Sequence, residues 1–277
     1  MEPDSAPVRL DAIERAHLKD RDDRSHVMHR YAPDPELDGF VQRFWIPVWS
    51  VRPGEEAPQR VLQYPVCLIV VTPEYARFYG VVSGLSTTRL TGDGWAVGVM
   101  LAPAAGYLLA RTSVAAYTDR AVDVGEVLGE DGARLTERVR AAMTPGPHDP
   151  QAHAAAMAAC AQVLRPYLPV DREGELVNRL VAHVEEHRDL LRVAQLCEAF
   201  DLTERGLQRL VARRLGLTPK WLISRRRLQE AAERLRQDPG STGELAAVLG
   251  YADQAHFIRD FSRVTEMTPG RFAARHR

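Results

Sequence analysis

Four polar side chains in the C-terminal third of the chain have the spacing of one helix face: Arg205, Gln208, Arg209 and Arg213. Steps of three, four and eight residues place side chains along one side of an α-helix. Arginine can pair bidentately with guanine, and glutamine with adenine, in the DNA major groove, which admits a helix. The pattern favours a helix that contacts bases. The alternative is a solvated basic face without a partner.

A second polar set follows about fifty residues later, in the segment QAHFIRDFSRV. Its apolar residues recur at helical period, which predicts an amphipathic helix with one buried stripe. The polar residues left on the outer face are Gln254, His256, Arg259 and Arg263. His256 by itself also fits a packing residue or a phosphate contact.

The elements that position the first set form a helix, a short turn and a second helix. The segment Arg192–Phe200 predicts the first helix, and Asp201-Leu202 forms the turn. Thr203 is an N-cap candidate, because its hydroxyl can accept from an amide in the first helical turn. The second helix then covers 204–215 and ends at Gly216, a residue suited to a helix C-terminus.

The same arrangement recurs after a long predicted helix over 219–238. A short helix over 244–249 ends at Gly250, and Asp253 is the N-cap candidate for the second polar helix. A helix of about twenty residues spans roughly 30 Å, close to one turn of B-DNA at about 34 Å. The two units therefore predict one bipartite DNA-binding domain rather than two independent ones.

These residues resemble the AraC/XylS family of bacterial transcription regulators over about Leu176 to Arg277. The resemblance depends on LCEAFDLTERGLQRLVARRLGLTPKWL in the first unit and ELAAVLGYADQAHFIRDFSRVTEMTPGRF in the second. The most typical positions of the second unit are Ala246, Gly250-Tyr251, Asp253-Gln254, His256-Phe257, Arg259, Phe261, Thr268-Pro269 and Phe272.

The resemblance implies sequence-specific binding of promoter DNA. Base-facing positions of the family's first recognition helix match Arg205, Gln208 and Arg209, and exposed positions of the second match Gln254, His256 and Arg259. We add Thr203, Arg213 and Arg263 on the same helices as candidate DNA contacts. The chain departs from the family pattern at Val211, where an aromatic residue is usual, and at Met267, where a glycine is usual.

Residues 31–102 predict a β-rich barrel or sandwich, because short apolar runs alternate with turn signals such as Asp93-Gly94. Helical segments follow over 103–143. The predicted fold is α+β, with an all-α C-terminal domain. We divide the chain into a mobile arm (1–30), a β-rich sensor or dimerisation domain (31–143), a linker with a helix (144–174) and the double helix-turn-helix domain (175–277).

The β-rich region resembles the cupin-like sensor halves of such regulators, through YAPDPELDGFVQRFW and GVMLAPAAGYLL. The resemblance implies a small-molecule effector. The aromatic residues that could line its pocket are Trp45, Trp49, Tyr64, Phe78 and Trp95. Ordinary core packing is the alternative for these side chains. A domain that only dimerises or binds a partner protein is the alternative for the whole region, and an enclosed pocket would favour sensing.

Composition narrows the function further. Residues 172–277 hold 19 Lys and Arg against 15 Asp and Glu, whereas residues 1–171 hold 17 against 22. A basic C-terminal region fits a nucleic-acid partner. No apolar stretch of membrane-spanning length and no signal-peptide pattern is present, so we expect a cytoplasmic protein without a membrane partner.

The three cysteines, Cys67, Cys160 and Cys197, lack the close spacing of a metal cluster or a disulfide framework. The chain also lacks the G-x-S-x-G pattern of a hydrolase nucleophile. We therefore expect no enzyme activity, no cofactor and no metal site. The expected partners are double-stranded DNA, an effector, RNA polymerase and a second copy of the chain.

Overall fold

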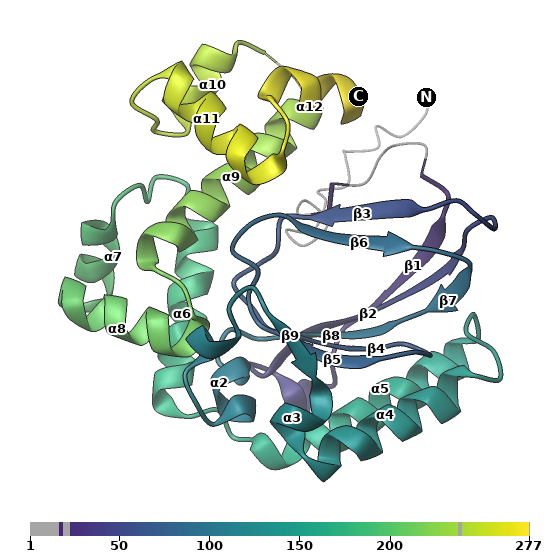
Figure 1. Ribbon diagram of the computed structural model, residues 1–277. Helices are drawn as coiled ribbons and strands as arrows, with labels where there is room; N and C mark the ends of the chain where they lie inside the picture. Colours follow the sequence, from purple (N-terminus) through teal and green to yellow (C-terminus); the bar gives the residue numbers. More distant parts are fainter. Residues whose placement is uncertain (1–16, 19–22, 238–239, 277) are drawn as a thin grey trace, which may run out of the picture.

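The structure is a computed structural model that describes residues 17–18, 23–237 and 240–276. Strands and their covering helices form the N-terminal part, and helices alone form the C-terminal part (Figure 1). This confirms the predicted α+β class, with a β-rich region followed by helices and an all-α C-terminal region.

Antiparallel strands form two sheets in the N-terminal part. The larger sheet has the order β1-β2-β8-β4-β5-β9, with β7 paired to β2, and β3 pairs with β6 as a separate two-stranded ribbon. The strands are β1 (His26–Tyr31), β2 (Val41–Ser50), β3 (Ala57–Val61), β4 (Leu68–Val71), β5 (Ala76–Tyr79), β6 (Ser86–Leu90), β7 (Asp93–Trp95), β8 (Val97–Leu101) and β9 (Ala121–Asp123).

Strand β2 shows how the larger sheet is used on both faces. Successive side chains of a strand point to opposite faces, so Phe44, Ile46 and Val48 share one face. All three are buried in a cluster with apolar residues of α4 (Glu130–Met143) and α5 (Pro150–Leu164). These two helices lie beneath the sheet in Figure 1. The opposite face of the sheet points toward the β3–β6 ribbon.

Further short helices connect these elements. They are η1 (Pro35–Leu37), α2 (Ala105–Ala110), η2 (Val114–Tyr117), α3 (Val124–Leu128) and η3 (Arg165–Tyr167). Asp123 caps α3, because its carboxylate accepts from the Gly125 amide at 2.8 Å. The segment from α2 to η2 lies next to the C-terminal helices and forms part of the junction between the two regions.

The predicted mobile arm (1–30) extends too far, because residues 26–31 form strand β1. His26 pairs with Trp49 and Tyr31 with Phe44 across β1 and β2. The alternation of HVMHRY is polar on both faces, so the segment has no apolar period in the sequence. Residues 1–16 and 19–22 of the predicted arm lie outside the described residues.

The predicted linker also differs from the structure. Asp149 caps α5 by accepting from the Gln151 amide at 2.8 Å, and the helix then buries Ala156 and Cys160 against the core. His153, fully buried on α5, lies 2.7 Å from the Tyr31 hydroxyl through its Nδ1. By its packing, α5 belongs to the N-terminal domain.

Seven helices follow among the described residues up to His276, and they confirm the two helix-turn-helix units joined by a long helix. The first unit is α7 (Val193–Phe200) with α8 (Glu204–Leu215), and the second is α10 (Thr242–Val248) with α11 (Gln254–Thr265). The helix that joins them is α9 (Pro219–Gln237). Helix α6 (Arg172–Glu186) precedes the first unit, and α12 (Pro269–His276) follows the second.

Within the described ranges, no helix has the length and apolar character needed to cross a membrane. The same residues contain no group of three His, Cys, Asp or Glu side chains placed to hold a metal ion. Cys67 and Cys160 are fully buried, and burial raises the pKa of both thiols to about 12. Both cysteines therefore act as apolar core residues.

Candidate nucleic-acid interface and ligand cavity

The turn between α7 and α8 has the caps expected from the sequence. Asp201 adopts the left-handed conformation (φ 50°) at the end of α7. The Thr203 hydroxyl accepts from the Gly206 amide at 3.1 Å, and Gly216 ends α8 at φ 69°. These local interactions fix where α8 begins and ends.

Helix α8 has one exposed polar face and one docked end. Arg205, Gln208 and Arg209 are exposed together, with Gln208 donating to Glu204 at 3.1 Å. Arg213 lies apart from them. Its guanidinium donates to Glu173 at 2.5 Å and lies 5.7 Å from the Tyr107 ring. The structure therefore places Arg213 at the junction with the N-terminal domain rather than with the other three.

The second unit repeats this geometry. The Asp253 carboxylate accepts from the His256 amide at 2.7 Å and so caps α11. Gly250 has a φ of 72°, a left-handed conformation that favours glycine there. The predicted polar residues on α11 are all exposed: Gln254, His256, Arg259 and Arg263.

Asp260 orders part of the exposed face of α11. It lies 3.1 Å from Arg263 and 3.7 Å from His256. The departure at Met267 leaves the fold intact, because Glu266 takes the left-handed conformation (φ 60°) and Met267 is buried. Behind the exposed face, the rings of Phe257, Phe261 and Phe272 follow one another at 5.7 and 5.3 Å and form the core of the unit.

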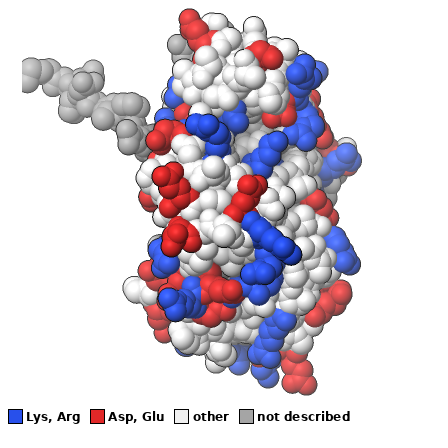
Figure 2. Space-filling view, turned by 90° about the vertical axis from the view of Figure 1, so that its left-hand side faces the viewer, with Lys and Arg blue, Asp and Glu red and all other residues white. Residues whose placement is uncertain are grey.

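Helix α9 contacts both helix-turn-helix units. Arg226 donates to the Leu190 carbonyl at 2.8 Å and to Glu230 at 3.1 Å, beside the first unit. The guanidinium of Arg227 lies 3.9 Å from the Tyr251 ring of the second. These buried and half-buried contacts connect the two exposed polar faces through one helix. Figure 2 shows the side of the molecule that lies at the left in Figure 1. Basic side chains follow one another there from the upper to the lower part, with acidic side chains between them.

The same helix also contacts the N-terminal domain through backbone carbonyls. Arg225 donates to Ser83 at 2.5 Å and to Gly84 at 3.0 Å, and Trp221 Nε1 donates to Ser83 at 3.0 Å. Burial lowers the pKa of Arg225 to about 10.

Farther along α9, two more side chains make contacts of this kind. Gln229 donates to Leu62 at 2.9 Å, and Arg236 donates to His17 at 2.9 Å. Together with Arg225 they attach α9 to three separate segments of the N-terminal domain.

A charged cluster joins the end of α8 to the start of α6, beside Tyr107 of the N-terminal domain. Arg214 is buried and donates to Asp171 at 2.6 Å and to Glu173 at 2.8 Å, with its guanidinium 4.1 Å from the Tyr107 ring. Burial raises the pKa of the Asp171 carboxyl, but hydrogen bonds from Arg214 and the Gly174 amide outweigh it, and the net pKa is lowered. Hydrogen bonding from Arg214 likewise lowers the pKa of Glu173.

A cavity of about 330 Å³ lies between the larger sheet and the β3–β6 ribbon. Three of the aromatic candidates, Trp45, Trp49 and Tyr64, line it. Phe78 and Trp95 do not, which corrects their assignment. Both are buried in the cluster on the helix-covered face, where the Phe78 ring lies 5.4 Å from the Tyr117 ring.

Phe78 and Trp95 are each one residue away in the sequence from a residue that does line the cavity. Tyr79 and Gly94, their immediate neighbours, line the cavity. A shift of one residue along a strand moves a side chain to the other face, and the sequence alone left that register open. The alternation on β2 was the available signal, and it also points to Arg43, which the prediction missed and which lines the cavity.

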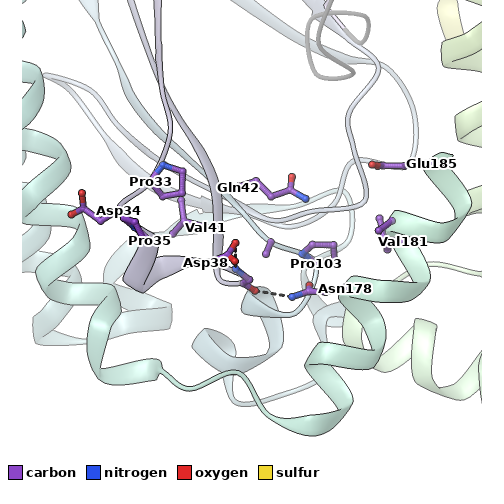
Figure 3. A pocket seen from close by; sticks show the side chains of 13 residues that line it. Pro33, Asp34, Pro35, Asp38, Val41, Gln42, Pro103, Asn178, Val181 and Glu185 are labelled. Atoms are coloured by element: carbon purple, nitrogen blue, oxygen red, sulfur yellow. Dashed lines mark hydrogen bonds between the residues drawn. The ribbon is translucent and has the colours of Figure 1, made fainter.

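A second hollow is an open groove between residues 33–42 and α6 (Figure 3). Asn178 of α6 connects its two sides, because its side chain donates to the Gly39 carbonyl at 2.7 Å and accepts from the Ala104 amide at 2.9 Å. Its rim includes Asp34, Asp38 and Glu185. The groove marks a junction between the two regions and is more open than the cavity.

Comparison with known proteins places both regions. A family model described as a helix-turn-helix domain matches residues 196–275, and a domain of unknown function (DUF6597) matches residues 29–123. The C-terminal region is therefore similar to the helix-turn-helix domains of AraC-type transcription regulators.

Two curated relatives match over the C-terminal region. The transcriptional activator RhaS of Escherichia coli O1:K1 / APEC is 30% identical over 101 residues, which cover 36% of each chain. The transcriptional regulator MtrA of Neisseria gonorrhoeae is 26% identical over 122 residues, or 40% of each chain. The chain thus spans between one third and one half of the length of these relatives.

Solved structures match over a longer stretch at low similarity. ToxT from Vibrio cholerae O395 is 12% identical, with 91% of this chain and 98% of that chain covered, at a TM-score of 0.38. The xylose-binding transcription activator XylR covers 44% of this chain and 39% of its own, with 16% identity and a TM-score of 0.32.

Proposed function

We propose that this chain is a sequence-specific DNA-binding transcription regulator that a small molecule controls from the cavity beneath the β3–β6 ribbon. A promoter-binding role implies a cytoplasmic location and RNA polymerase as a further partner. The observation that supports DNA recognition most directly is the pair of capped helices α8 and α11, each exposing arginine and glutamine side chains and both attached to α9.

The geometry fits two successive major grooves. Helix α9 has 19 residues, which corresponds to roughly 28 Å at 1.5 Å per residue. One turn of B-DNA is about 34 Å. Arg205, Gln208 and Arg209 would contact one half-site, and Gln254 and Arg259 the other.

Control from the cavity is supported by where α9 attaches. Ser83 and Gly84, whose carbonyls accept from Arg225, lie between the cavity-lining residues Val82 and Ser86. Leu62, the acceptor of Gln229, lies between the lining residues Val61 and Gln63, and His17, the acceptor of Arg236, is itself a lining residue. A ligand that displaces these walls would displace α9, to which both recognition helices are attached.

DNA recognition is tested by genome-wide footprinting of the purified chain, followed by affinity measurements on the recovered sites. We expect affinity to fall steeply with salt, because binding releases counterions from the phosphates. We also expect a preference of about a thousandfold or more over unrelated DNA. Equal affinity for all duplexes would contradict sequence-specific regulation.

A different role for the N-terminal domain is self-association without sensing. Strand β1 is an edge of the larger sheet, and Val27 on it is 53% exposed. Exposed edges can pair with another chain. Analytical ultracentrifugation of the wild type and Val27→Lys tests this role. A dimer lost in the variant would support homodimerisation through β1, whereas a monomeric wild type would exclude it.

A further inference from the structure

The cavity floor contains two indole rings that lie on glycines of neighbouring strands. Trp45 of β2 is paired with Gly98 of β8, and Trp49 is paired with Gly94 of β7. A Cβ added to either glycine would collide with the indole of the tryptophan paired with it, since the nearest atoms are all atoms of that ring. Each indole therefore occupies the space above its glycine and lies against the sheet.

This arrangement turns aromatic faces toward the cavity. Both tryptophans line it and both are half-buried. The polar atom of Trp49 is already satisfied, because its Nε1 donates to the Thr91 carbonyl at 3.2 Å. The Trp49 ring therefore presents a flat aromatic surface to a ligand. Planar rings stack favourably on such a surface in an offset arrangement.

Positive charge lies beside this aromatic floor. Arg43 precedes Trp45 by two residues on the same face of β2, and Arg30 of β1 is directly opposite Trp45. Both arginines line the cavity, and Arg43 is half-buried whereas Arg30 is exposed. Burial lowers the pKa of Arg43, which nevertheless stays cationic at neutral pH, so a desolvated anion beside it is favoured.

The acidic residues of the lining lie near the solvent, whereas His26 is buried. Glu74, in the turn between β4 and β5, and Asp93, at the start of β7, are exposed, and Arg89 is paired with Glu56 at 3.4 Å. His17 and His26 line the side near β1. Along β2, the charged side chain nearest the two indole rings is therefore that of Arg43, which is half-buried and positive.

We propose that the cavity binds a planar one- or two-ring compound that carries a carboxylate, with the ring on Trp45 and Trp49 and the anion at Arg43 and Arg30. This deepens the proposed function and rests on it. A volume of about 330 Å³ is near the lower limit of small-molecule sites, about 300–1,000 Å³, and suits a molecule of this size.

Titration calorimetry of the full chain tests the proposal with three probes. Indole-3-acetate has a planar ring and a carboxylate, indole-3-ethanol has the ring without the charge, and nonanoate has the charge without the ring. We expect indole-3-acetate to bind at least tenfold more tightly than either of the others. If nonanoate binds as tightly as indole-3-acetate, the proposed stacking on the indole rings is wrong. If indole-3-ethanol binds as tightly as indole-3-acetate, the proposed anion site is wrong.

Two cavity variants and one control locate the bound probe. Trp45→Leu and Arg43→Gln should each weaken indole-3-acetate at least tenfold, whereas Arg52→Gln, at a side chain 85% exposed and outside the cavity, should not. Thermal unfolding shows whether each variant is folded. If Trp45→Leu fails to fold, Arg43→Gln alone decides, and unchanged binding in it overturns the proposal.

DNA affinity measured on the same samples distinguishes failure of the proposed ligand class from failure of the proposed DNA-binding function. DNA binding without any binding of indole-3-acetate overturns the ligand class and leaves the regulator intact. Binding of indole-3-acetate without any DNA binding contradicts the proposed regulator and leaves the cavity assignment standing.

Discussion

Arg225 in the middle of α9 donates to the carbonyl of Ser83, 142 residues earlier in the chain, at 2.5 Å. The acceptor belongs to the loop that enters β6, next to residues that line the cavity. One side chain of the helix between the two recognition units thus contacts the loop that adjoins the cavity wall. Mechanical coupling between cavity and DNA-binding face requires a contact of this kind.

Removing this contact should loosen the wall without unfolding the chain. In Arg225→Met the half-buried Gly84 carbonyl loses this donor, and a hydrogen bond from a charged group contributes about 1.5–3 kcal/mol. We expect faster hydrogen–deuterium exchange in peptides covering 80–90. Arg234→Met is the matched control, because Arg234 pairs with Glu230 on the same helix. Unchanged exchange in Arg225→Met would show that α9 does not hold the loop.

The two classes of arginine on α8 should behave differently toward DNA. Arg209→Ala should weaken binding to the recovered site by about 1–3 kcal/mol, as expected for loss of a base contact. Arg213→Ala should change specific affinity much less, because Arg213 is paired with Glu173 at the domain junction. Competition gel shifts measure both. Equal losses in the two variants would contradict this division of α8.

The N-caps of the recognition helices should contribute measurably to stability. Thr203→Ala and Asp253→Ala each remove an acceptor for an amide of the first turn, at 3.1 Å from Gly206 and 2.7 Å from His256. Each substitution should cost about 0.5–2 kcal/mol in urea unfolding. Thr203→Ser and Asp253→Asn keep an acceptor and should recover most of the loss. If the conservative variants are no better than alanine, capping is not the cause.

The junction at Arg214 should weaken in acid. The pKa values of Asp171 and Glu173 are lowered in the folded chain. Their stabilisation is therefore complete above the unfolded values, near 3.8 and 4.5, and is lost as the pH falls through the lower folded values. Thermal midpoints between pH 6 and pH 3 should fall less in Asp171→Asn/Glu173→Gln than in the wild type. Parallel curves would exclude this pair as the source.

The sequence located the recognition helices because their limits depend on neighbouring residues. A cap hydroxyl or carboxylate acts on an amide three residues away, and a left-handed glycine ends a helix on its own. Thr203, Asp253 and Gly216 accordingly lie where the sequence predicted. The aromatic residues of the N-terminal region fitted a pocket or ordinary core packing, and the sequence left both open.

Only the tertiary structure decided which side chains face the cavity and how the domains meet. Strand register places Trp45 inside and Phe78 outside, and a shift of one residue would exchange them. Strand β1 is polar on both faces, so its pairing with β2 has no counterpart in the apolar pattern. Arg225, which resembles any surface arginine in the sequence, is buried because its carbonyl acceptors come from a distant loop. Caps are local and therefore visible in the sequence, whereas register and docking depend on partners distant along the chain.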